Sequence, residues 1–78
     1  NGKFSLRQDK ALLGWVVDEI ASKKKSVLTL EEVRGILVGV GASDTMIGIN
    51  RSINYLISQS FLMTGVRENE YLYTGRMV

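Results

Sequence analysis

Cysteine and histidine are both absent from this sequence. Without cysteine, the chain can form neither a disulfide framework nor a thiolate metal site, and we expect its fold to be indifferent to redox conditions. Without histidine, it lacks the commonest general base of enzymes and the commonest ligand of metal ions. We therefore expect no cofactor and no metal site.

Apolar runs long enough to cross a bilayer are missing as well. The longest run, residues 35–42, is rich in glycine and falls well short of the roughly 18–20 residues that a spanning helix needs. No signal-peptide pattern is present, and the chain begins with Asn1 rather than methionine. We expect a domain excised or processed from an intracellular protein of the cytoplasm, nucleoid or nucleus, without membrane contact.

The sequence has little excess charge of either sign: ten Lys/Arg residues and eight Asp/Glu residues give a net charge of +2. This balance permits an anionic partner without demanding one, since many DNA-binding modules are far more basic. Hydrophobic residues make up 45% of the 78 positions, as in an ordinary globular domain. We expect residues 5–78 to form a single domain, and residues 1–4 to be a tail that is disordered or derived from cloning.

The most informative segment that is present is residues 43–60, which have helical periodicity and begin with Ser43 as the expected N-cap. One side of this helix is apolar and is predicted to face the core: Met46, Ile49, Ile53, Leu56 and Ile57. The other side carries mostly short hydrogen-bonding side chains around one arginine and one tyrosine: Asp44, Ile47, Gly48, Arg51, Asn54, Tyr55 and Ser58. A face of this kind is suited to contact a partner.

Residues 5–24 are predicted to form an earlier helix, because Ser5 followed by Gln8 has the spacing of a capping box. Its apolar stripe is expected to face the core: Leu6, Leu13, Val16, Val17 and Ile20. Trp15 projects nearly opposite this stripe. It is therefore either buried beneath another part of the fold or an exposed anchor for a protein partner.

Residues 29–40 are predicted to form the helix between these two, with Thr29 and Glu32 as a second capping box. Gly35 and Gly39 weaken this helix by roughly 1 kcal/mol each relative to alanine. We interpret them as places where a crossing helix approaches closely.

Residues 61–74 are predicted to form a β-hairpin, because two β-prone runs are joined by a polar connection over residues 67–70. Gly65 is interpreted as a bulge in its first strand. Residues 26–29 are short and β-prone, which indicates a small edge strand. The sequence thus predicts an α+β fold of three helices, a short strand and a C-terminal hairpin.

This order of elements resembles the winged-helix family over nearly the whole chain. Gly35 and Gly39 are similar to the small-residue and glycine positions of a helix-turn-helix, and Met46 matches its next apolar position if the turn holds one extra residue. The resemblance implies a winged helix-turn-helix in which the helix over residues 43–60 enters the major groove of duplex DNA and the hairpin 61–74 is the wing.

The resemblance also implies which residues contact nucleic acid: Ile47, Gly48, Arg51, Asn54, Tyr55 and Ser58 on the helix, and Arg67 at the wing tip. Arg51 has the geometry to fork onto guanine or a phosphate, and Asn54 could read adenine. The consecutive Lys23, Lys24 and Lys25 either complement the negative end of the first helix or contact further phosphates. The implied function is a DNA-binding module of a transcription or replication factor, acting as a homodimer or beside adjoining domains.

The alternative function is that of a winged helix that binds another protein, through Trp15 or the face of helix 43–60. The low net charge and the charge of −1 over residues 67–70 favour this alternative, because they disfavour phosphate binding. Ile47, Tyr55 and Tyr71 are further candidate anchors. We expect no enzyme, no catalytic residue and no small-molecule substrate. The neighbouring carboxylates at 18–19 and 31–32 point about 100° apart around their helices, so neither pair converges on a site.

Overall fold

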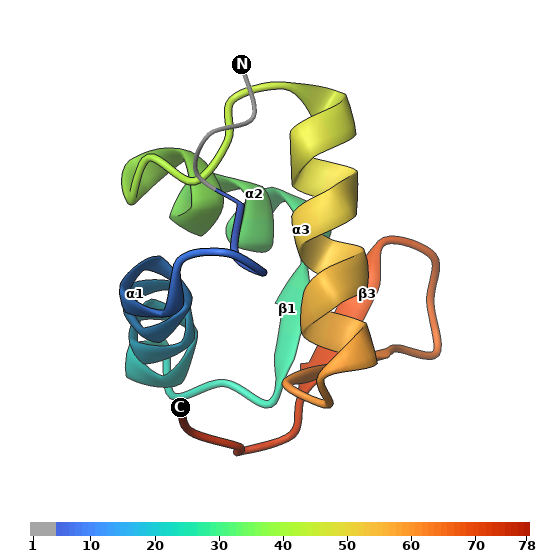
Figure 1. Ribbon diagram of the computed structural model, residues 1–78. Helices are drawn as coiled ribbons and strands as arrows, with labels where there is room; N and C mark the ends of the chain where they lie inside the picture. The colour runs from blue at the N-terminus through green and yellow to red at the C-terminus, as the bar shows by residue number, and fades with distance from the viewer. Residues whose placement is uncertain (1–4) are drawn as a thin grey trace.

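The computed structural model describes residues 5–78, and the predicted tail, residues 1–4, lies outside the described part (Figure 1). The described chain contains three helices and a small antiparallel sheet, in the following order: α1 (Lys10–Ser22), β1 (Val27–Thr29), α2 (Leu30–Gly39), α3 (Met46–Ser58), β2 (Leu62–Thr64) and β3 (Glu70–Tyr73). The α+β class and the order of elements predicted from the sequence are confirmed.

The sheet has the strand order β1-β3-β2, so the last strand of the chain lies in the middle. β2 and β3 form the predicted hairpin, and β1 pairs antiparallel with β3 as the predicted edge strand. Gly65 follows β2 where the chain approaches β3 closely. Its N–H donates to the Glu70 carbonyl at 2.7 Å, and a Cβ at this position would lie 2.9 Å from the same oxygen, so the approach requires glycine.

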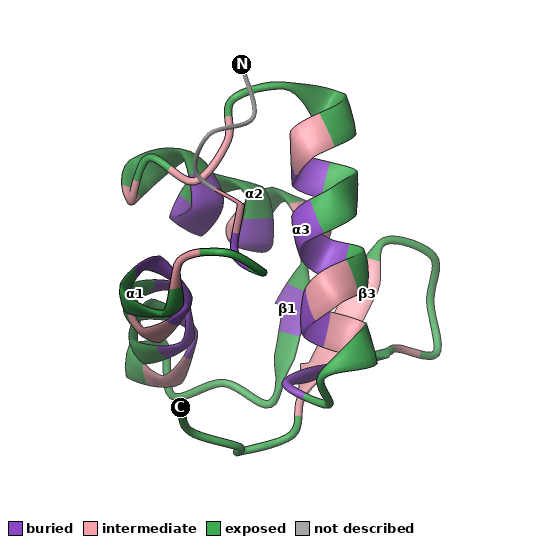
Figure 2. Cartoon of the chain, in the orientation of Figure 1, coloured by how far each residue is buried: buried purple, intermediate pink, exposed green. Residues whose placement is uncertain are grey.

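The core lies where the three helices meet the inner face of the sheet (Figure 2). α2 contacts both α1 and α3 as well as β1, so it joins the two outer helices. The largest side chains with almost no exposure come from every helix, from the two edge strands and from the turn before α1: Leu6, Ile20, Leu28, Leu37, Ile49, Leu56 and Leu62. Each such side chain contributes roughly 1.5–3 kcal/mol of burial free energy, which fixes the face that each helix turns outward.

The first helix begins later than predicted. Its N-cap is Asp9, whose side chain accepts from the Leu12 N–H at 3.1 Å. Ser5 opens a separate turn instead, in which the N–H groups of Gln8 and Asp9 both donate to its carbonyl at 3.1 Å. The capping box at Ser5 is therefore wrong. The turn lets Leu6 pack into the core with 2% exposure, while the carboxylate of Asp9 supplies the cap.

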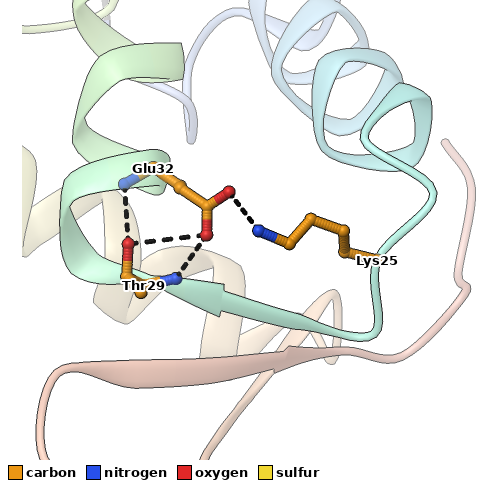
Figure 3. A network of polar contacts seen from close by, with 3 residues as sticks. All are labelled: Lys25, Thr29 and Glu32. Carbon is orange, nitrogen blue, oxygen red and sulfur yellow. Dashed lines mark hydrogen bonds and ion pairs between the residues drawn. The ribbon is translucent and has the colours of Figure 1, made fainter.

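The second helix begins as predicted, and Figure 3 shows its capping box. The Thr29 N–H donates to Glu32 Oε1 at 3.0 Å, and the Glu32 N–H donates to Thr29 Oγ1 at 3.2 Å. Lys25 Nζ lies 2.6 Å from the other oxygen of Glu32. The Lys25 hydrogen bond, followed by the Thr29 N–H, lowers the pKa of Glu32 from its ordinary value of 4.5.

The glycines within the second helix do not mark a helix crossing. Both Gly35 and Gly39 are exposed, and a Cβ built on either would meet no atom within 4 Å. That interpretation is therefore wrong. After the C-cap of α2, Val40, the backbone turns at Gly41, which has φ +79° and whose N–H donates to the Val38 carbonyl, while the Ala42 N–H donates to the Leu37 carbonyl at 2.8 Å. These two bonds form a Schellman motif.

The third helix begins at Met46 and has Thr45, not Ser43, as its N-cap. Because Ala42 is still bonded to α2, residues 43–44 must turn the chain before a new helix can begin. Asp44 consequently precedes the N-cap and lies outside the first turn of α3. Met46 is 54% exposed rather than part of the core, and Ser52, 8% exposed, joins the buried side instead.

Candidate functional site

A groove of about 990 Å³ runs along one flank of α3. Its α3 wall contains all six helix residues that the sequence singled out: Ile47, Gly48, Arg51, Asn54, Tyr55 and Ser58. The opposite wall is residues 5–7 of the turn before α1 (dark blue between α1 and α3 in Figure 1), and the α2–α3 connection lines the end. We call this feature the α3 groove. The structure therefore brings the predicted face together in one place.

The outward side of α3 is formed by Ile47, Arg51, Asn54 and Ser58, which are all exposed. At 100° per residue they point away from the buried residue Ile49, and Ile47 is 67% exposed. An arginine fork, an amide and a branched apolar group are thus available to a partner at successive turns of one helix.

Two of the predicted contact residues, Tyr55 and Ser58, also interact within the domain. Tyr55 is half-buried and packs against the core, so only part of its ring faces the groove. The hydroxyl of Ser58 donates to the Tyr55 carbonyl at 2.8 Å, so its proton is engaged inside α3 rather than free for a phosphate. That Ser58 contacts nucleic acid stays a prediction.

Gly48 has a structural reason to be glycine. A Cβ at this position would lie 2.9 Å from Ser43 Cβ and 3.0 Å from Thr45 Oγ1. Its N–H donates to the same Thr45 oxygen at 3.0 Å. The residue therefore lets the α2–α3 connection fold over the first turn of α3, and it shapes that end of the groove.

Arg7 belongs to the groove, although the sequence did not single it out. Its guanidinium carbon lies over the Tyr55 ring, 5.3 Å from the centroid, a cation–π contact worth about 0.5–1 kcal/mol at an exposed site. The sequence prediction placed Arg7 in the first turn of a helix, where it drew no attention. No local signal could have revealed it, because its contact with Tyr55 joins segments far apart in the chain.

The charged residues that line the groove are Arg7, Arg51 and Asp44, which gives it a net charge of +1. Among the described residues the ion pairs are Lys25–Glu32 and Arg34–Glu31, so neither groove arginine is neutralised by a carboxylate there. A surface with two unpaired guanidinium groups and several amide and hydroxyl groups can bind an anion through charge-assisted hydrogen bonds.

The remaining predicted nucleic-acid contacts lie outside the groove. Lys23 is the C-cap of α1, Lys24 follows it with φ +54°, and Lys25 pairs with Glu32. Figure 1 places this α1–β1 connection at the end of the molecule opposite the α2–α3 connection. Arg67 is exposed in the β2–β3 connection. The lysines and the groove therefore do not form one continuous site.

Trp15 lies on the outer side of α1 and is 61% exposed. The interpretation that it is buried beneath another part of the fold is wrong, and its exposed alternative agrees with the structure. An exposed indole is unusual because tryptophan is highly buried on average, so this side of α1 is a second candidate contact surface.

No three acidic side chains among residues 5–78 gather closely enough to hold a metal ion. None of the helices described is long and apolar enough to span a bilayer. Comparison with protein-family models, with curated proteins and with solved structures yields no match to this chain.

Proposed function

We propose that this chain is a winged helix-turn-helix domain that binds duplex DNA as a module of an intracellular transcription or replication factor. The order of elements supports this assignment, as does the sheet, in which β3 returns from the hairpin to pair with β1. In such a domain α2 and α3 are the helix-turn-helix, and β2, β3 and their connection are the wing.

The observation that carries the proposal is the outward side of α3. Arg51 lies at its centre without a carboxylate partner among the described residues. An α-helix fits the major groove of B-DNA, where a guanidinium can fork onto guanine, an amide such as Asn54 can pair with adenine, and an apolar group such as Ile47 can meet a thymine methyl.

The proposed wing contributes little attraction. Its tip, residues 67–70, contains Arg67 and two glutamates and has a charge of −1. Since each phosphate contact needs a cation, a single subunit would make few of them. We therefore propose that tight binding requires a homodimer or adjoining domains of the parent protein.

A protein-binding domain is the second candidate, and the exposure of Trp15 favours it. Aromatic anchors dominate the energetics of protein interfaces, and α1 offers one that the fold does not use. The apolar side chains Val38, Met46 and Ile47 are also exposed near the α2–α3 connection.

Titration with random-sequence duplex DNA at low and moderate salt distinguishes the two candidates. DNA binding predicts an affinity that falls with salt, and Arg51→Ala should weaken it roughly three- to tenfold. Arg34→Ala is the matched control, because it removes the same charge from an exposed site on α2 outside the groove. If the wild type does not bind even at low salt, the protein-binding function replaces this proposal.

A further inference from the structure

The turn over residues 5–8 is hydrogen-bonded within itself and packs against the domain. Two backbone N–H groups donate to the Ser5 carbonyl, the Gln8 N–H also reaches Ser5 Oγ at 3.3 Å, and Leu6 is buried in the core beside them. These contacts set the position on the surface from which the next side chain, Arg7, projects. A fixed guanidinium loses less entropy on binding than one on a free tail.

Arg7 is also fixed at its far end. Its guanidinium lies over the ring of Tyr55, and that ring is held by its packing against the core. A cation–π contact uses the charge of the guanidinium and none of its hydrogen-bond donors. The contact therefore leaves the N–H donors of the guanidinium for an acceptor in the groove.

The occupant of the groove follows from its charge. Two arginines on facing walls outweigh one aspartate, and neither arginine has a carboxylate partner in the part of the chain described. Planar guanidinium groups match the oxygens of a phosphodiester bidentately. Resting on the DNA-binding function proposed above, we infer that the α3 groove seats one strand of the DNA backbone and that Arg7 is its phosphate-binding residue, while Arg51 reaches the bases.

A phosphate contact affects every sequence alike. Arg7→Ala should therefore weaken binding to a selected site and to random-sequence duplex by the same factor, roughly fivefold to tenfold, and should reduce the slope of log K against log salt by about 0.9. Arg7→Lys should keep the slope, because the charge remains after the stacking on Tyr55 is lost. Arg34→Ala should leave both quantities unchanged.

The outcomes separate this inference from the proposed function. If the wild type binds DNA with a salt-dependent affinity and Arg7→Ala has the same slope, the inference is overturned and the proposed function stands. If Arg7→Lys loses as much of the salt slope as Arg7→Ala while both melt like the wild type, the slope does not report the charge at this position, and the phosphate assignment is also overturned. If the wild type binds no duplex, both proposals fail.

Discussion

The guanidinium of Arg76 donates a hydrogen bond to the carbonyl of Gln59, the C-cap of α3, from 17 residues further along the chain. The same group lies over the Phe61 ring, 4.6 Å from its centroid. Thr74 Oγ1 also donates to the Ser60 carbonyl at 2.6 Å. The segment after β3 therefore closes the C-terminal end of α3, where a cation complements the helix dipole.

Arg76→Ala should destabilise the domain by about 1 kcal/mol, since it removes an exposed cation–π contact and a charge-assisted hydrogen bond. Urea unfolding followed by circular dichroism measures this loss. Arg34→Ala, which breaks only an exposed pair with Glu31 at 3.5 Å, should change stability by less than about 0.5 kcal/mol. Equal effects of the two substitutions would show that the closure of α3 by Arg76 contributes nothing.

Gly48→Ala should destabilise the domain by about 1–3 kcal/mol, although alanine is the better helix former. The added methyl group would meet Ser43 Cβ, which is attached directly to the backbone and cannot swing away. Gly35→Ala is the matched control, because a Cβ there meets nothing within 4 Å and should stabilise α2 by about 0.5–1 kcal/mol. Thermal melts of both variants test the pair, and a stabilised Gly48→Ala would contradict the close approach.

Glu32 gives the domain part of its acid sensitivity. Its pKa is lowered from 4.5, first by the hydrogen bond from Lys25, so its contribution to stability is present above the unfolded-state pKa and is lost as the pH falls through the lower folded-state pKa. Melting temperatures measured from neutral to acid pH should therefore fall less steeply for Glu32→Gln than for the wild type. Parallel curves below pH 4.5 would rule out this role of the Lys25–Glu32 contact.

Trp15 should behave as a solvent-exposed indole. With 61% of its surface exposed, we expect red-shifted fluorescence that a soluble quencher reduces readily. Trp15→Ala should change the unfolding free energy by less than about 0.5 kcal/mol, as for surface residues in general. A blue-shifted emission in the isolated chain would mean that another surface covers the ring, and self-association measured by light scattering would then identify a second copy as its cover.

The local elements were predictable because their signals lie within a few residues of each other. The predicted capping box of Thr29 and Glu32, the hairpin and the polar face of α3 agree with the structure, whereas the close approach at Gly65 was not predicted from the sequence. The starts of α1 and α3 were not predictable in the same way. Ser5 and Ser43 have N-cap chemistry, but so do Asp9 and Thr45, and packing chooses between them.

The amino-acid sequence by itself determined the order of helices and strands and most of the residues that share each face of α3, since both depend on periodicity and on hydrogen bonds between near neighbours. Only the tertiary structure decided that Trp15 is exposed, that the glycines of α2 face open space, and that Arg7 lies over Tyr55. All three depend on which segments far apart in the chain meet, and therefore on how side chains fill one shared core.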